Sequence, residues 1–277
     1  MKVKDVMTSD VKGVEIPGNR EEALELLKEL KVSALPAIKQ GTNKLIGIIR
    51  LRDFFENPDE SQLGMLVNRD IITITPDAPV EEAAKKMLEN NVRRLPVIED
   101  EKLSGIITVR DIVYRVIAER EIEAPALGYM QKSITLIWED TPLKVAVEIL
   151  GAAKARALPV IDSDGKLVGI IGDADIINVS EVETEEIKEQ MGGRSESDSW
   201  TWDSEDRIYI TKRSLKPSDK LVKDVMTKDV VTITKRTDAT KCAKLLKEHQ
   251  IEQVPVTSGR KLLGIVRDDD LLKVLSE

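Results

Sequence analysis

Four aspartates follow short apolar segments at a fixed distance from a glycine, and their carboxylates are the groups best suited to ligand chemistry. The segments are Gly47-Ile-Ile-Arg-Leu-Arg-Asp53, Gly105-Ile-Ile-Thr-Val-Arg-Asp111, Gly169-Ile-Ile-Gly-Asp-Ala-Asp175 and Gly264-Ile-Val-Arg-Asp-Asp-Asp270. An aspartate at the start of a helix can accept hydrogen bonds from both hydroxyls of a ribose, and such charge-assisted bonds are strong. The glycine would let the backbone come close to the ligand. The same spacing also forms a helix capping box, so both roles stay open.

The residue three positions before each aspartate could face a phosphate group. Thr108 holds this place before Asp111, where its hydroxyl can donate to a phosphate and the adjacent helix start favours an anion. Gly172 holds it in the third segment. Arg50 and Arg267 hold it in the first and fourth segments, where each either reaches a phosphate or plugs the pocket.

An apolar-Pro step lies upstream of each aspartate, and in two of the four copies arginine precedes that step. The second copy has Arg93-Arg94 and the third has Arg156, whereas the first has Ser33-Ala34 and the fourth has Glu252-Gln253. Guanidinium groups suit phosphate recognition, although these arginines could also be ordinary surface charge. The copies should therefore differ in affinity, with the site at Asp111 the best formed.

The chain around each aspartate repeats one supersecondary unit, and the second copy shows its order most clearly. Residues 71–74 form a β-branched strand, and the apolar residues of 80–88 lie on one stripe of a helix. Residues 95–98 and 103–108 form two further strands, and a second helix begins at Asp111. We expect a mixed α/β fold with the order strand, helix, strand, strand, helix in each repeat.

The spacing of the motif glycines predicts four repeats and one insert. The boundaries are 1–60, 61–122, 123–182 and 220–277 for the repeats, and 183–219 for the insert. One such unit covers only part of its sheet, so we expect repeat one to pair with two and three with four. In the insert, Val182 to Met191 is expected as a helix. Trp200 and Trp202 are expected to form a hairpin with Ile208 to Ile210, which staples the two halves or docks a partner.

Composition excludes several classes of protein. The chain has 277 residues, a net charge of −8 and one residue each of cysteine and histidine, which argues against a nucleic-acid role, a disulfide framework and a His/Cys metal site. Cys242 falls on the apolar face of an expected helix and is assigned to the core. The first residues lack the apolar stretch of a signal peptide, and no apolar run could cross a membrane. We expect a cytoplasmic protein.

The motifs together resemble the CBS domain, whose pairs are called Bateman modules. The resemblance rests on the segments Asp5-Val-Met-Thr8 and Asp224-Val-Met-Thr227, the apolar-Pro step and the Gly-to-Asp motif. Four repeats in one chain are most similar to the γ subunit of AMP-activated protein kinase. The resemblance implies two Bateman modules in a flat disk, with adenine nucleotides in clefts and their phosphates pointing inward. It also implies that the motif aspartate binds ribose, that the threonine approaches phosphate, and that the paired basic positions contact phosphates.

The expected function is non-catalytic binding of AMP, ADP or ATP by an energy-sensing regulatory protein, with a kinase or another effector as partner. Apolar residues such as Ile72 and Val97 would hold the adenine, unless they belong to the core. The sequence has no catalytic set, requires no metal, and leaves a homodimer open. One alternative is a sensor of S-adenosylmethionine or another adenosyl ligand. Another is a structural adaptor with vestigial pockets.

Overall fold

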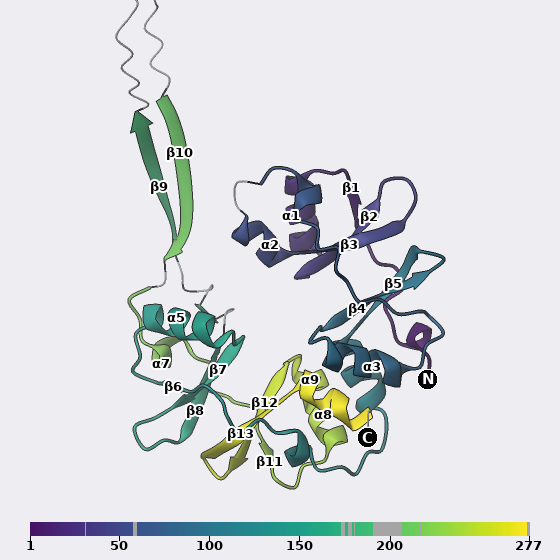
Figure 1. Cartoon of the computed structure of the whole chain (residues 1–277). Helices are drawn as coiled ribbons and strands as arrows, with labels where there is room; N and C mark the ends of the chain where they lie inside the picture. The colour runs from purple at the N-terminus through teal and green to yellow at the C-terminus, as the bar shows by residue number, and fades with distance from the viewer. Residues whose placement is uncertain are drawn as a thin grey trace, which may run out of the picture. The chain divides into compact units, whose positions relative to one another are not determined.

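The computed structural model shows the chain as a series of small sheets and helices (Figure 1). It describes residues 1–30, 32–57, 60–172, 175–176, 179, 181–190, 207–216 and 218–275. The chain divides into two compact units, which are described separately. Unit 1 consists of Met1–Lys132, Thr232–Thr257 and Leu263–Glu277, and unit 2 of Ser133–Val231 and Ser258–Leu262.

Unit 1 contains the first two repeats, joined through one five-stranded sheet of order β1-β2-β3-β5-β4. Its elements are η1 (Val3–Asp5), β1 (Val14–Ile16), α1 (Arg20–Glu29), β2 (Ala34–Lys39), β3 (Lys44–Arg50), α2 (Leu51–Glu56), η2 (Leu63–Met65), α3 (Val80–Glu89), β4 (Arg94–Glu99), β5 (Lys102–Thr108), α4 (Val109–Ile112), η3 (Val113–Ile117) and η4 (Ala126–Tyr129). Strands β3 and β5 meet in antiparallel pairing at Lys44 and Lys102. The expected pairing of repeats one and two is therefore confirmed.

The first strand expected in repeat two is reduced to a single bridge. Residues 71–74 were expected as a strand, but only Ile74 pairs, in parallel, with Val97. Pro76 follows two residues later and the chain turns away there, so no second ladder step forms. The helix stripe is confirmed, because Val80, Ala83, Ala84 and Met87 of α3 are all buried.

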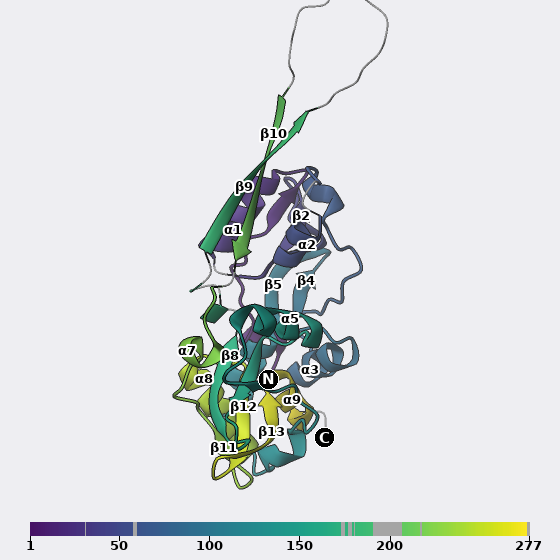
Figure 2. The same cartoon turned by 90° about the vertical axis from the view of Figure 1, so that its left-hand side faces the viewer.

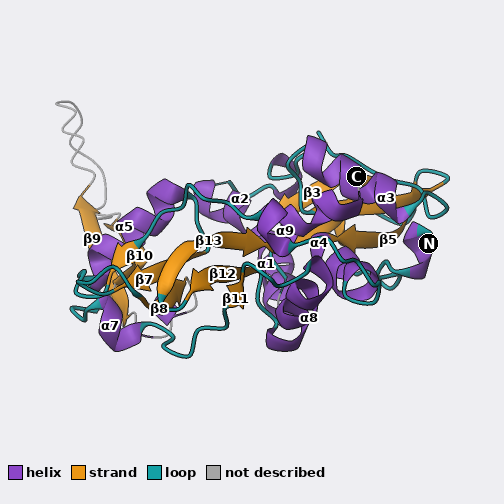
Figure 3. Ribbon diagram, turned by 90° about the horizontal axis from the view of Figure 1, so that it is seen from below, coloured by secondary structure: helices purple, strands orange, loops and turns teal. Residues whose placement is uncertain are grey.

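The helices of repeat four pack on those of repeat two within unit 1 (Figure 3). Repeat four supplies β11 (Ile233–Thr234), α8 (Ala239–His249), β12 (Gln253–Ser258), β13 (Lys261–Arg267), α9 (Asp268–Leu271) and η5 (Leu272–Leu275). The hydroxyl of Tyr114 in η3 donates to the carbonyl of Leu246 in α8 at 2.9 Å. Cys242 is fully buried, and this burial raises the pKa of its thiol to about 12. Its assignment to the core is confirmed.

Unit 2 contains repeat three on a three-stranded sheet of order β6-β7-β8. Its elements are β6 (Ile137–Trp138), α5 (Leu143–Ala153), β7 (Ala157–Ile161), β8 (Leu167–Gly172), β9 (Glu181–Gln190), β10 (Arg207–Lys216) and α7 (Val222–Val225). Its core gathers residues such as Leu143, Leu158 and Ile171 between α5 and the sheet. Lys166 of repeat three bridges Lys261 of repeat four, as Lys44 bridges Lys102 in the first pair.

The insert departs from the sequence-based expectation. The helix expected from Val182 to Met191 is wrong, because Glu181–Gln190 is the strand β9 and pairs antiparallel with β10 along its whole length (Figure 2). The register sets Ile187 opposite Ile210, so a complementary strand decides the conformation of a segment whose own preference is ambiguous. Trp200 and Trp202 lie outside the described residues.

Among the described residues, none of the helices combines the length and the hydropathy that spanning a bilayer would require.

Candidate functional site

Each repeat lends its leading segment, the residues just before its first strand, to the repeat with which it is paired. The contacts are antiparallel bridges that join Thr8 to Ile106, Asn68 to Ile48, Gln131 to Ile265 and Thr227 to Ile170. Repeats one and two exchange these segments, and so do repeats three and four. Every motif strand therefore carries a leading segment from another repeat beside it.

The motif glycines make this exchange possible. A Cβ atom added to Gly105 would lie 2.7 Å from the carbonyl oxygen of Thr8 and 2.9 Å from the sulfur of Met7. Gly47, Gly169 and Gly264 meet the corresponding backbone in the same way. The glycine was expected to admit a ligand. In the structure the close neighbour is the leading segment of the paired repeat.

Asp53, Asp111 and Asp270 cap the helices that follow their strands, and Asp175 accepts the same backbone hydrogen bond. The backbone N–H three residues earlier donates to the carboxylate, from Arg50 to Asp53 at 2.8 Å, from Thr108 to Asp111 at 2.9 Å, from Gly172 to Asp175 at 2.9 Å and from Arg267 to Asp270 at 3.3 Å. At Asp111 the Thr108 hydroxyl also donates, at 2.6 Å, to the same oxygen. The capping role is thus confirmed, and each carboxylate is held at the end of its strand.

In repeats three and four the leading segment of the paired repeat also places a donor beside the aspartate, which sequence reasoning missed. The hydroxyl of Thr227 donates to Asp175 at 3.4 Å, and the side-chain amide of Gln131 donates to Asp270 at 2.9 Å. The Asp-Val-Met-Thr segments could have indicated this contact. The threonine that ends each segment forms the bridge to the paired repeat. Two repeats thus contribute side chains around one carboxylate.

In the first repeat, the residue three positions before the aspartate pairs with it through its side chain. The Arg50 guanidinium donates to Asp53 at distances between 2.8 and 3.2 Å, and Asp53 is buried. Of the two roles left open for Arg50, this geometry corresponds to the plug. For Arg267 the described contacts give only the backbone cap on Asp270, and the Asp270 carboxylate is paired with Lys273 at 3.0 Å instead.

Arg93 lies in a cluster of carboxylates from repeat four. Its guanidinium donates to both oxygens of Asp268, at 3.0 and 2.6 Å, and lies 3.3 Å from Asp269 and 3.6 Å from Glu252. Burial opposes the charged guanidinium, but the hydrogen bond and the charge of Asp268 outweigh it and raise the pKa of Arg93. Arg110 extends the cluster, 3.6 Å from Glu252. The basic position of repeat two and the acidic position of repeat four therefore neutralise each other.

We call these side chains, Arg93, Arg110, Glu252, Asp268 and Asp269, the Arg93 cluster. Asp269 is the member whose ionised form is least favoured. Burial raises the pKa of Asp269, and the charges of Asp268 and Asp270 act in the same direction against that of Arg93. Its Oδ1 atom is buried and, among the described residues, accepts no hydrogen bond. The environment thus disfavours the ionised carboxylate.

The remaining candidates differ in exposure. Arg94 donates to the Ser33 hydroxyl at 2.9 Å near the surface, so it touches the equivalent position of repeat one. Arg156 is exposed just before β7, and Ile72 is half-buried. Val97 is fully buried in β4, where it lies opposite Gly105.

Comparison with protein families assigns the repeats. The family model of the CBS domain matches residues 3–60, 63–118, 126–181 and 222–277, which make up most of the chain. The chain belongs to the CBS domain family. This assignment agrees with the four glycine-to-aspartate motifs and with their pairing through exchanged leading segments.

Two solved structures match this chain over almost its entire length. A crystal structure of an uncharacterized conserved protein from Pyrococcus horikoshii matches with a TM-score of 0.72 and 30% identity, covering 99% of this chain and 100% of that one. Protein MJ1225 from Methanocaldococcus jannaschii, described as a putative archaeal homolog of g-AMPK, matches with a TM-score of 0.69 and 20% identity over 99% of both chains. The second likeness shows the fold alone.

Shorter matches concern the CBS part of larger proteins. The inosine-5'-monophosphate dehydrogenase of Thermoplasma acidophilum is 35% identical over 112 residues, which are 40% of this chain and 22% of that enzyme. The chain thus spans about a fifth of that relative.

Proposed function

We propose that this CBS protein binds adenine nucleotides, AMP, ADP or ATP, and acts as a non-catalytic regulatory protein that reports their level to an effector protein. The ligand class is the one that the resemblance to the CBS family implies, and the chain belongs to that family. The observation that carries the proposal here is the carboxylate of Asp111, which caps α4 just after the end of β5 and can accept further hydrogen bonds.

The ribose part of the proposal rests on the geometry of Asp111. The backbone and hydroxyl of Thr108 both donate to its Oδ2 atom, while Oδ1 has only the Arg115 guanidinium at 3.6 Å among the described contacts. An ionised carboxylate has about four acceptor positions, so two ribose hydroxyls can still bind. Asp53 is less suited, because Arg50 already donates to both of its oxygens.

The phosphate part of the proposal requires competition for Arg93. A phosphate that reaches this guanidinium must draw it away from Asp268, Asp269 and Glu252. AMP, ADP and ATP share the base and the sugar, so their discrimination depends on how strongly each phosphate chain competes. Arg94 and Arg156, which lie nearer the surface, are the further candidates for phosphate contacts.

A thermal unfolding series tests the proposal. AMP, ADP, ATP, adenosine and S-adenosylmethionine are compared, since a specific ligand at 100 times its Kd stabilises the folded state by about 2.7 kcal/mol. We expect a shift with at least one adenine nucleotide and its loss in Asp111→Asn. Asp238→Asn, which alters the cap of α8 instead, should bind normally. A shift with S-adenosylmethionine alone would favour the adenosyl sensor, and no shift at all would favour the adaptor.

A further inference from the structure

One corner of the CBS repeat recurs along the chain, where the leading segment crosses the loop after the first strand. In the first pair of repeats, the backbone N–H of Lys4 donates to Pro76, and the Lys4 ammonium lies 2.8 Å from Asp77. In unit 2, the backbone N–H of Lys223 donates to Glu139, and its ammonium lies 2.6 Å from Asp140. At both corners a lysine of the leading segment therefore forms an ion pair with an aspartate of the loop.

The corresponding corner of unit 1 near repeat four lacks this ion pair. The bond from the Ala126 N–H to the Thr237 carbonyl matches those from Val3 to Ala78 and from Val222 to Thr141. Leu127 therefore occupies the position of Lys4 and Lys223, and Arg236 occupies that of Asp77 and Asp140. An apolar residue replaces the lysine, and a cation replaces the acid.

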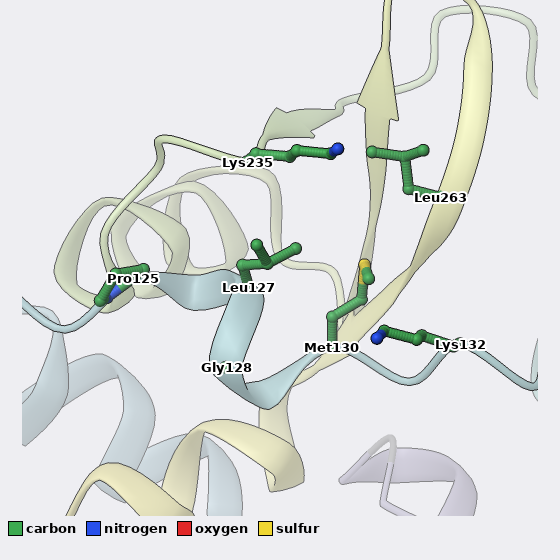
Figure 4. A pocket seen from close by; sticks show the side chains of 7 residues that line it. All are labelled: Pro125, Leu127, Gly128, Met130, Lys132, Lys235 and Leu263. Atoms are coloured by element: carbon green, nitrogen blue, oxygen red, sulfur yellow. The ribbon is translucent and has the colours of Figure 1, made fainter.

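A cavity of about 830 Å³ lies at this corner (Figure 4). It is lined by Pro125, Leu127, Gly128, Met130, Lys132, Lys235 and Leu263. Leu127, Met130 and Leu263 supply apolar walls, and the side chains of Lys132 and Lys235 extend inward from opposite sides. Within the described part of the chain, neither lysine has an ion-pair or hydrogen-bond partner. The cavity therefore combines apolar surface with two uncompensated positive charges, on a chain whose net charge is −8.

The cavity is separate from the motif aspartate. Gln131 lies between Met130 and Lys132 and directs its side chain to Asp270. Successive side chains of an extended segment point to opposite faces, so Met130 and Lys132 face the cavity while Gln131 faces the aspartate.

We propose that this cavity is a second ligand site, which takes a small organic anion with an apolar body. Pockets of about 300 to 1,000 Å³ with apolar walls and a few convergent polar groups are typical ligand sites. The ammonium groups of Lys132 and Lys235 neutralise the anionic group, and the body of the ligand packs on Leu127, Met130 and Leu263. The site is distinct from the proposed nucleotide site, because its lining includes neither Asp111 nor Thr108.

The test uses anilinonaphthalene sulfonate as probe and the methyl resonance of Met130 as readout. The probe has an aromatic body and one sulfonate, and phenylnaphthylamine is its uncharged counterpart. AMP is kept in excess throughout so that the probe does not enter an adenosine cleft. We expect the sulfonate to shift the Met130 methyl resonance at lower concentration than phenylnaphthylamine. The Lys132→Ala/Lys235→Ala variant should raise the Kd of the sulfonate about tenfold, equivalent to ~1.4 kcal/mol, and leave the Kd of phenylnaphthylamine unchanged.

Two further variants separate the site from general effects. A Cβ at Gly128 would have no heavy atom within 4 Å, so Gly128→Trp is expected to fold and to block the cavity. Lys244→Ala removes an exposed lysine of α8 outside the cavity and should bind the probe normally. Equal weakening by Lys244→Ala, undiminished binding to Gly128→Trp, or a Met130 resonance that the sulfonate does not shift would each overturn the proposal.

Discussion

Loss of Arg93 should destabilise unit 1 far more than loss of another arginine of the Arg93 cluster. In Arg93→Ala, Asp268 loses two hydrogen bonds of 3.0 and 2.6 Å while it stays only 3% exposed. Removing one partner of a buried ion pair costs about 3–5 kcal/mol, because the other charge is left without compensation. The Arg93 side chain is 27% exposed, so we expect the lower end, about 3 kcal/mol.

The matched changes in the same cluster should cost less. Arg110→Ala removes a guanidinium that is 51% exposed and 3.6 Å from Glu252, which should cost about 0–1 kcal/mol. Asp268→Asn leaves Arg93 with Asp269 and Glu252 as partners, so we expect the free energy of unfolding to fall by about 1 kcal/mol.

Urea unfolding followed by circular dichroism measures these free energies. The double variant Arg93→Ala/Asp268→Ala should lose clearly less than the sum of its single variants, since residues in contact typically couple by about 0.5–3 kcal/mol. If Arg93→Ala unfolds at the same urea concentration as Arg110→Ala, the ion pair does not hold repeats two and four together.

Three shorter predictions concern other parts of the structure. Gly105→Ala should lower the free energy of unfolding by about 1–3 kcal/mol through the clash with the leading segment, whereas Gly151→Ala, in open space on α5, should raise it by about 0.5–1 kcal/mol; urea titrations that rank them equally would contradict this. The pKa of Asp269 is raised from its unfolded-state value of 3.8, so ionisation of this carboxyl destabilises the folded protein as pH rises above 3.8. Asp269→Asn should therefore have the higher free energy of unfolding at pH 7. This difference should disappear when the pH falls below 3.8. Melting curves across pH check the sign. Arg50→Ser should remove the ion pair on Asp53 and so allow its carboxylate to bind adenosine. Calorimetry should then give more adenosine molecules bound per chain than for the unchanged protein.

The sequence was sufficient for what depends on local spacing. The repeat, the helix stripe of α3 and the capping position of Asp111 all follow from residues within a few positions of each other. Capping boxes and amphipathic helices depend on residues that are neighbours in the sequence, so the sequence alone can predict them.

What the sequence could not show depends on distant partners. Arg93 and Asp268 are 175 positions apart, so nothing in the Arg93-Arg94 pattern indicated that the guanidinium is neutralised. The role of Gly105 depends on the backbone of Thr8, which another repeat supplies. The strand β9 likewise depends on β10, to which it pairs along its whole length.

The most direct measurement of the central claim is a crystal structure grown with AMP. The account predicts that the ribose hydroxyls lie within hydrogen-bond distance, about 2.5–3.0 Å, of the Asp111 carboxylate, with Thr108 still bound to the same side chain. AMP bound with its sugar away from every motif aspartate, or well-ordered crystals in which millimolar AMP does not bind at Asp111, would contradict it.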